Sequence, residues 1–351
     1  YCGDCLEVMR GMESETVNCV VTSPPYYGLR DYGIEGQMGL EPTLEQYIGQ
    51  LAEVFREVKR VLKNDGTLWL NMGDSYAGSG KGAWNNKHGG QKEVYIPDTG
   101  SAQSKLTKVP RNLKPKDLMG VPWRVAFALQ SDGWYLRQDI IWAKPNPMPE
   151  SVTDRCTKSH EYIFLFSKLP KYYYDNEAIK DPTGPKGDAN GFRGGAYCNN
   201  DSNNDTMEKR THVGNKKQRV PAGWDTRQGA HGAFHREGRS PDIEYVTSNL
   251  PFRNKRSVWT VATRPFKEAH FATFPEELIR PCIKAGSPIG GTVLDPFVGA
   301  GTVPVVCIQE QRNYIGIEIN PKYIEIAKRR IACTERSGSL FSAESLKEEA
   351  I

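Results

Sequence analysis

A serine, two prolines and a tyrosine (Ser23-Pro24-Pro25-Tyr26) directly follow a short β-branched run at residues 17–22. The run lacks a helical period and predicts a buried strand that the prolines end. The prolines remove backbone donors, which leaves carbonyl oxygens and the Ser23 hydroxyl as acceptors beside a flat aromatic ring. Such a turn suits a planar ring that bears an exocyclic amine, because acceptors bind its N–H groups and tyrosine stacks on it. The simpler alternative is a strand-ending turn with Tyr26 in the core.

A second turn whose residue types could bind a ligand lies near the other end of the chain. A predicted strand at residues 292–294 runs through Asp295 into a turn that contains Gly299 and Gly301, and a helix starts at Thr302. The glycines allow a tight turn and close approach of a ligand, and the helix start offers free N–H groups. Glu318 ends the next predicted strand, where a carboxylate accepts hydrogen bonds from ribose hydroxyls. The pattern predicts a nucleoside-cofactor site rather than a turn that binds nothing.

The details of this second turn narrow the cofactor class. The third glycine of a dinucleotide fingerprint is replaced by Pro304, and no Lys-Ser/Thr pair follows as in a phosphate-binding P-loop. Asp295 would repel a phosphate and would suit an ammonium group. S-adenosyl-L-methionine carries an ammonium, a sulfonium and adenosine but no phosphate, so it is the expected cofactor. A nicotinamide oxidoreductase is disfavoured.

The elements that must position these turns alternate between helix and strand. A helix at residues 44–62 is opened by a Thr43/Gln46 capping box and closed by residues 64–66. Strands are expected at 67–72, 134–142, 162–167, 292–294 and 314–319, and helices at 122–132, 275–285, from 302 and after 321. This order predicts an α/β fold with a mostly parallel sheet, helices on both faces and ligands at the carboxyl ends of the strands.

Composition excludes several other classes. The 351 residues include 46 Lys+Arg against 42 Asp+Glu and are 38% hydrophobic, which is typical of a globular protein and not of a disordered, collagen-like or coiled-coil chain. No apolar run approaches the roughly 18 to 20 residues that span a bilayer, so no membrane association is expected. The eight cysteines are dilute, and the one C-x-x-C pair (Cys2 and Cys5) has no second pair, so no metal is assigned.

Charge is distributed unevenly along the chain. Residues 76–118 hold 8 Lys/Arg against 3 Asp/Glu, and residues 183–256 hold 13 against 8, which is +5 for each segment. Both segments are rich in Gly, Asn and Ser, and the second also contains Trp224, His212, His231 and His235. Basic loops of this kind favour contact with nucleic acid, because Lys and Arg neutralise phosphates. Two solvated flexible loops are the alternative.

Taken together, the motifs resemble a known family. Val-Thr-Ser-Pro-Pro-Tyr at 21–26 with Asp-Pro-Phe-Val-Gly-Ala-Gly-Thr at 295–302 is similar to the amino-group DNA methyltransferases, which methylate cytosine N4 or adenine N6. Further matches lie at 3–6, 73–75, 142–144, 155, 160–162, 270–275 and 316–320. The catalytic turn precedes the cofactor turn, which resembles the class β motif order. The resemblance implies a Rossmann-like S-adenosylmethionine-dependent methyltransferase fold with an inserted target-recognition region.

The resemblance also implies domain boundaries and roles for residues. Residues 1–182 form the catalytic half with a basic flexible insertion at 76–118, 183–256 the target-recognition region, 257–335 the cofactor-binding half and 336–351 a tail. Lys144 and His160 are expected to be structural. The residues implied to hold the target base are Ser23, Pro24, Pro25 and Tyr26. Those implied to bind the cofactor are Asp4 (adenine amine), Phe274 and Pro275 (adenine pocket), Asp295, Phe297, Gly299, Gly301 and Thr302 (methionine part), Glu318 (ribose) and Asn320.

The expected function is methyl transfer from S-adenosyl-L-methionine to the N4 amine of a cytosine flipped out of double-stranded DNA. Thr-Ser before Pro-Pro-Tyr favours cytosine, and adenine N6 is the alternative. A non-catalytic DNA-binding module and an RNA substrate also remain open. The protein is expected in the cytoplasm of a bacterial, archaeal or phage-infected cell. A solitary methylase and the partner of a restriction endonuclease would carry the same motifs, and the oligomeric state stays open.

Overall fold

The computed structural model describes residues 1–28, 33–77, 110, 112–182, 252–264 and 274–348, with side chains placed up to residue 336. It divides the chain into two compact units, one formed by Tyr1–Lys180 with Asn254–Ile351 and the other by Asp181–Arg253. In the second unit, β5 (Asp181–Pro182) pairs antiparallel with β6 (Phe252–Arg253). Trp224 and the three histidines of the predicted target-recognition region lie outside the described residues, as do residues 270–273.

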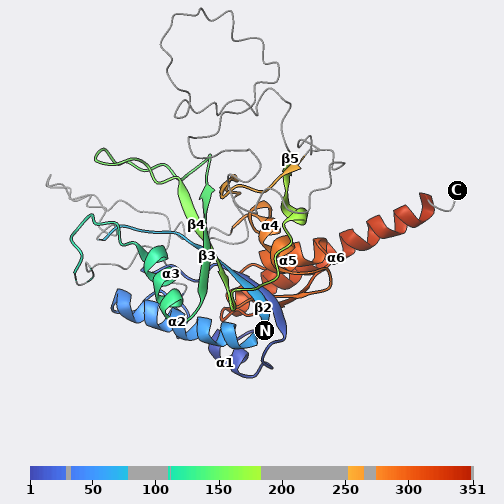
Figure 1. The fold of residues 1–351 in the computed structure, drawn as a ribbon, viewed down its shortest axis with the longest axis horizontal. Coiled ribbons are helices and arrows are strands. Elements are labelled where there is room, and N and C mark those ends of the chain that lie inside the picture. Colours follow the sequence, from blue (N-terminus) through green and yellow to red (C-terminus); the bar gives the residue numbers. More distant parts are fainter. Residues whose placement is uncertain (29–32, 78–109, 111, 183–251, 265–273, 349–351) are drawn as a thin grey trace, which may run out of the picture. The chain divides into compact units, whose positions relative to one another are not determined.

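The first unit is built on a seven-stranded sheet with the order β7-β3-β4-β2-β1-β8-β9 (Figure 1). Neighbours are parallel except at β4, which runs antiparallel to both β2 and β3. The strands are β1 (Val17–Thr22), β2 (Leu62–Met72), β3 (Tyr135–Ala143), β4 (His160–Ser167), β7 (Val258–Thr260), β8 (Thr292–Asp295) and β9 (Asn313–Gly316). The predicted mostly parallel sheet of an α/β fold is confirmed.

Helices cover both faces of the sheet because successive strand residues point to opposite sides. Val20 and Leu68 pack in one core cluster with residues of α1 (Cys5–Arg10), α2 (Leu44–Val61) and α3 (Val121–Ser131). Val21 and Trp69, one residue further along each strand, pack in a second cluster with α4 (Glu276–Gly286) and α5 (Thr302–Gln309). The last helix, α6 (Pro321–Glu348), packs along α5 and continues past residue 335 (Figure 1).

Helix α2 begins as predicted and ends earlier than predicted. The capping box is present: the Gln46 amide N–H donates to Thr43 Oγ1 at 3.2 Å, and the Thr43 N–H donates to Gln46 Oε1 at 3.1 Å. The expected stop at residues 64–66 is wrong, because Leu62 already begins β2 and pairs with Val17. Gly66 is needed inside this strand, since a Cβ there would lie 2.5 Å from Leu62 Cγ.

Strand β9 and two short elements, α1 and β7, also differ from the sequence expectation. Strand β9 ends at Gly316 rather than at residue 319. The Ile317 N–H still donates to the carbonyl of Asp295 on β8, but the Ile317 carbonyl already accepts from the Val298 N–H of the glycine turn at 2.9 Å. Helix α1 and strand β7, six and three residues long, were not predicted because such short elements carry no readable period.

The two described ends of the predicted insertion at 76–118 meet. Tyr76 forms a bridge with Leu118, the Ala77 N–H donates to the Asp117 carbonyl at 2.8 Å, and the Met119 N–H donates to the Ser75 carbonyl at 2.9 Å. These bonds return the chain to the start of α3. Residues 78–109 and 111 of the insertion lie outside the described residues.

Candidate active site

The carboxyl ends of β1 and β8 bring the two predicted turns together. These strands are neighbours in the sheet, β1 ends at Thr22 directly before the proline turn, and β8 ends at Asp295 directly before the glycine turn. The Thr22 hydroxyl donates a hydrogen bond to Asp295 Oδ1 at 2.6 Å, across 273 positions of sequence. Parallel strands present their carboxyl ends at one edge, so a short hydrogen bond between the two turns follows from the strand order.

Asp295 is the most enclosed acid of this edge, with 1% of its surface exposed. Besides the Thr22 hydroxyl, the backbone N–H of Phe297 donates to its Oδ1 at 3.0 Å. Burial, with a smaller contribution from the charge of Glu318, raises the pKa of Asp295 to about 7. A cationic group beside this carboxylate would offset the cost of its ionisation.

Glu318 is held beside the glycine turn. Its Oε2 accepts from the Gly299 N–H at 3.0 Å and its Oε1 from the Asn320 N–H at 2.9 Å, while burial raises its pKa. The Gly3 N–H donates to the Glu318 carbonyl at 2.9 Å, which brings the start of the chain alongside. The next residue, Asp4, caps α1 by accepting from the Glu7 N–H at 3.0 Å. The structure thus gathers the predicted ribose and adenine carboxylates on adjacent segments.

The two glycines of the turn serve different purposes. Gly299 has φ +50°, and a Cβ there would meet no atom closer than 3.9 Å. Glycine is therefore needed at 299 for the left-handed backbone conformation and not to make room for a neighbouring group. Gly301 has φ +82°, and a Cβ there would lie 2.9 Å from Ala327 Cβ on α6. Glycine at 301 therefore also lets α6 pack against the turn, a role that the sequence pattern did not reveal.

Arg330 of α6 is a residue of this turn that sequence reasoning missed. Its Nη1 donates to the Ala300 carbonyl at 2.8 Å and to Thr302 Oγ1 at 3.2 Å, so one guanidinium ties α6 to both sides of Gly301. It also lies 3.5 Å from Glu276 Oε1 of α4. No motif marks Arg330, because it stands among other basic residues of an amphipathic helix.

The other predicted cofactor residues have visible structural contacts. Phe274 packs against the core cluster of α4 and α5, and Pro275 is buried as the N-cap of α4. Asn320 caps α6, since its Oδ1 accepts from the Lys322 N–H at 3.0 Å. These contacts explain the local fold, and the cofactor roles of these residues stay predictions.

In the proline turn, the Tyr26 hydroxyl is anchored by groups from β2 and β4. It donates to Glu161 Oε2 at 2.9 Å and to Asn71 Oδ1 at 3.4 Å, and it accepts from the Ser23 hydroxyl at 3.4 Å. Gly73 makes room for the ring, because a Cβ there would lie 2.7 Å from Tyr26 Cε2. Burial, followed by the charge of Glu161, raises the pKa of Tyr26 well above its usual value.

Two further residues connect to this tyrosine. Lys144 at the end of β3 forms an ion pair with Glu161, which in turn accepts from Tyr26. From the sequence, Glu161 received no role of its own and was included only in the matched stretch 160–162. Its neighbour His160 does not take part in this network and packs edge-to-face against Tyr162. The sequence held these residue types, but only the pairing of β4 with β2 and β3 brings them to Tyr26.

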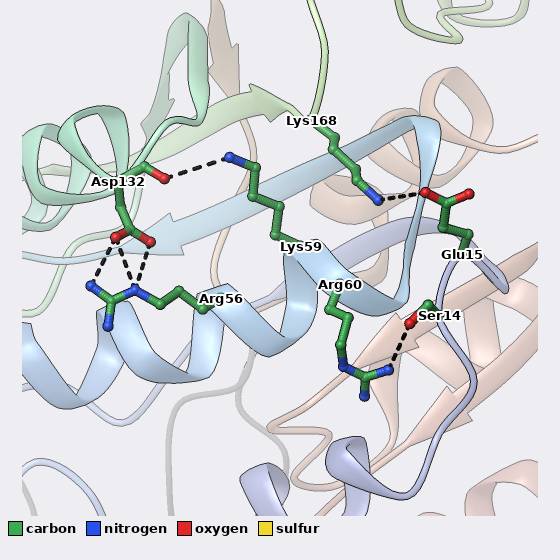
Figure 2. Close-up of a pocket in the computed structure, with 7 residues that line it drawn as sticks. All are labelled: Ser14, Glu15, Arg56, Lys59, Arg60, Asp132 and Lys168. Atoms are coloured by element: carbon green, nitrogen blue, oxygen red, sulfur yellow. Dashed lines mark hydrogen bonds and ion pairs between the residues drawn. The ribbon is translucent and has the colours of Figure 1, made fainter.

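A cavity of about 560 Å³ lies at the opposite edge of the sheet, where β1, β2 and β3 begin (Figure 2). It is lined by Ser14, Glu15, Arg56, Lys59, Arg60, Asp132 and Lys168. Its cations already have partners: Arg56 is paired with Asp132 at 2.8 Å, and Lys168 with Glu15 at 3.3 Å. None of the predicted site residues lines this cavity.

Comparison with known proteins identifies the family. A family model described as DNA methylase, of the N6/N4 type, matches residues 17–329. The chain belongs to the N6/N4 DNA methylase family. This methylase is 45% identical to the type II methyltransferase M.Cfr9I of Citrobacter freundii over 94% of the chain and 86% of the relative. It is 45% identical to M.SmaI of Serratia marcescens over 94% of the chain and 89% of that relative.

Solved structures show the same fold at lower identity. The PvuII DNA methyltransferase, described as cytosine-N4-specific, superposes on this methylase with a TM-score of 0.55 at 16% identity, covering 94% of this chain and 84% of that one. The Thermus thermophilus protein TTHA0409, in complex with S-adenosyl-L-methionine, gives 0.52 at 22% identity and covers 95% and 92%. Among the described residues, no helix is long and apolar enough to cross a membrane.

Proposed function

We propose that this DNA methylase transfers a methyl group from S-adenosyl-L-methionine to the exocyclic N4 amine of a cytosine extruded from double-stranded DNA. The observation that carries the proposal is the Thr22–Asp295 hydrogen bond at 2.6 Å, because it joins the proline turn, which suits an aromatic amine, to the glycine turn, which suits a cationic cofactor. The cytoplasm is the compartment we expect for this reaction.

The acids at the glycine turn fit the cofactor. Asp295 is buried, already hydrogen-bonded and has a raised pKa of about 7, so an ammonium group at this position would bind the ionised form. Glu318 stands next to the turn and suits the ribose hydroxyls, as carboxylates do at this place in α/β sheets. S-adenosyl-L-methionine supplies the ammonium and ribose, and its sulfonium supplies an activated methyl group.

The proline turn fits an aromatic amine. The amine lone pair is delocalised into the base ring and is a poor nucleophile, and hydrogen bonds from its two N–H groups to Ser23 Oγ and the Pro24 carbonyl favour a pyramidal nitrogen. The Pro25 carbonyl is not available in the same way, because Tyr47 Oη donates to it at 2.9 Å. Extrusion of the base costs a few kcal/mol, and stacking on Tyr26 returns about 1 to 3 kcal/mol.

The choice of cytosine rests on Thr22-Ser23 before the two prolines, the form that resembles the cytosine enzymes. Adenine N6 is the second candidate, because it presents the same pair of N–H donors. The basic residues 183–256 are proposed to read the DNA sequence. A cognate restriction endonuclease is the proposed partner, supported by the type II relatives.

The test is incubation of the protein with mixed-sequence DNA and methyl-labelled S-adenosyl-L-methionine, followed by digestion to nucleosides and mass spectrometry. We expect label in N4-methylcytosine. Label in N6-methyladenine would overturn the base assignment and keep the reaction. Label in RNA alone, tested in parallel, or in no nucleic acid would overturn the proposed function. Sequencing around the labelled base then gives the recognition site.

A further inference from the structure

The hydroxyl of Tyr26 lies among three polar groups, and two of them are fixed as acceptors. One oxygen of Glu161 pairs with the Lys144 ammonium, which has only donors, and the other faces the Tyr26 hydroxyl, so the Glu161 carboxylate accepts on both oxygens. Asn71 is oriented by its amide nitrogen, which donates to the Tyr162 carbonyl at 3.1 Å, so its Oδ1 faces Tyr26. The single phenolic proton is therefore directed to Glu161, at 2.9 Å, and to Asn71, at 3.4 Å.

This arrangement fixes the direction of the next hydrogen bond. Because Tyr26 gives its only proton to acceptors, its oxygen lone pairs remain for Ser23, and the Ser23 hydroxyl is the donor in the 3.4 Å contact between them. A serine has one hydroxyl proton, so Ser23 Oγ is left with lone pairs for any further partner. The chain of hydrogen bonds that starts at Lys144 and Glu161 and passes through Tyr26 thus ends at Ser23, whose oxygen is an acceptor.

We propose that the Lys144–Glu161 ion pair sets the direction of this hydrogen-bond chain, makes Ser23 an acceptor, and so selects a target base with an exocyclic amine over one with a carbonyl. Glu161 and Lys144 act through Tyr26 and Ser23 and are positioning residues. The inference rests on the proposed function, in which the target base lies at Ser23 and Tyr26.

Burial and a neighbouring aromatic ring hold the Lys144–Glu161 ion pair in place. Lys144 and Glu161 are each 17% exposed, so solvent and salt screen their attraction less than that of a surface pair. The Lys144 ammonium lies 4.2 Å from the centre of the Trp142 ring, which fixes it from a second side. Gly73 allows this packing, because a Cβ there would lie 3.3 Å from Glu161 Cδ as well as against Tyr26.

The selected difference is between bases of nearly equal shape. Cytosine and uracil differ at this position in an amine against a carbonyl, and adenine and hypoxanthine differ in the same way. An acceptor in the site leaves a carbonyl base with two facing lone pairs, which costs a hydrogen bond and adds repulsion. Shape alone does not separate such bases, so the direction of the Ser23 hydrogen bond becomes the deciding feature.

Two substitutions change the chain of hydrogen bonds and leave the shape of the side chain nearly the same. Tyr26→Phe keeps the stacking ring and removes the hydroxyl, which frees the Ser23 proton to rotate. Glu161→Gln replaces an obligate acceptor by an amide that can also donate, so the chain can reverse. Glu310→Gln is the matched control: Glu310 is 18% exposed and paired with Arg280, at the end of α5 and away from Tyr26.

The measurement is the dissociation constant for two duplexes in the presence of S-adenosyl-L-homocysteine. The duplexes carry the recognition site from the labelling experiment and differ only in an amine or a carbonyl base at the labelled position. The ratio of the two constants is compared between each variant and wild type, which cancels the different cost of opening the two base pairs. We expect the preference for the amine to fall about tenfold in Tyr26→Phe and Glu161→Gln and to stay unchanged in Glu310→Gln.

Equal weakening of both duplexes would show that the ion pair only supports the fold and would overturn the inference. Retention of the wild-type preference in Glu161→Gln would overturn it as well. Either result leaves the proposed function standing if the wild-type protein labels DNA. Failure of the wild-type protein to methylate DNA would instead overturn the proposed function.

Discussion

The two edges of the central sheet treat charge in opposite ways. At the carboxyl edge, Asp295 and Glu318 are enclosed and have raised pKa values because burial opposes their ionisation. At the other edge, shown in Figure 2, the cations are paired: Arg56, whose side chain is 59% exposed, forms an ion pair with Asp132, Lys168 forms one with Glu15, and Lys59 donates to the Gly133 carbonyl at 2.7 Å. At the first edge, burial disfavours the ionised form of the acids. At the second edge, the cations already have ion-pair or hydrogen-bond partners.

This difference indicates where a ligand is needed. An enclosed carboxylate gains from a cation that the described part of the chain does not supply, whereas a cation already bound to carbonyls and carboxylates gains little from an added anion. The cavity of about 560 Å³ lies at the edge whose cations are already paired, so it is the less suitable of the two places for a charged ligand.

The largest effect is expected from Asp295→Asn on the stability of the cofactor-free protein. The raised pKa of about 7 means that the unfolded chain ionises Asp295 at lower pH than the folded chain does, so wild-type stability falls as pH rises from about 4 to 7. The substituted asparagine keeps an oxygen to accept from Thr22 and Phe297 without a charge. Denaturant unfolding at pH 8 should show a gain of up to about 4 kcal/mol, with no such gain at pH 4.

The same Asp295→Asn protein should lose affinity for S-adenosyl-L-methionine by calorimetry, because the ammonium loses its anionic partner. In wild type the affinity should rise as pH increases through 7, while the variant should stay nearly flat. A variant that is destabilised at pH 8, or that binds the cofactor as wild type does, would contradict the contrast between the edges.

Tyr26→Ala should have the next largest effect, on methyl transfer rather than on stability of the cofactor complex. Loss of the ring removes a stacking contribution of about 1 to 3 kcal/mol. Transfer of labelled methyl to DNA should therefore fall by about tenfold to a hundredfold, with an unchanged calorimetric affinity for S-adenosyl-L-methionine. Undiminished transfer would remove Tyr26 from the base site.

Arg330→Met should give a moderate loss of cofactor affinity, about fivefold to tenfold, because the Ala300 carbonyl and Thr302 hydroxyl lose the donor that holds the glycine turn. Arg280→Met is the matched control, since Arg280 pairs with Glu310 and with Gln309 at the far end of α5 instead of with the turn. Similar calorimetric affinities for the two variants would show that Arg330 supports the helices rather than the turn.

Arg56→Ala should have the smallest effect. Its ion pair with Asp132 is exposed, and such pairs contribute little to stability. Thermal unfolding, cofactor affinity and methyl transfer should all stay close to wild type. A clear loss of methyl transfer would show that the edge in Figure 2 takes part in the reaction and would remove the distinction between the edges.

Local sequence signals located most of the elements that carry the site. The prolines after Thr22, the Thr43/Gln46 capping box and the Asp295-to-Thr302 turn each act within a few residues, so their effect is readable without the fold. The stop expected at residues 64–66 failed because pairing of Leu62 with the distant Val17 outweighed the turn preference of Asn-Asp-Gly. Helix α1 and β7 were too short to show a period.

The sequence by itself determined the residue types, the α/β order and the two turns, since backbone restriction, periodicity and capping are local properties. Only the tertiary structure decided that Thr22 bonds to Asp295, that Arg330 holds the glycine turn, and that Glu161 meets Tyr26. Each of these contacts depends on which strands and helices are neighbours. The burial that raises the pKa of Asp295 has the same origin, because desolvation is a property of the whole packed edge.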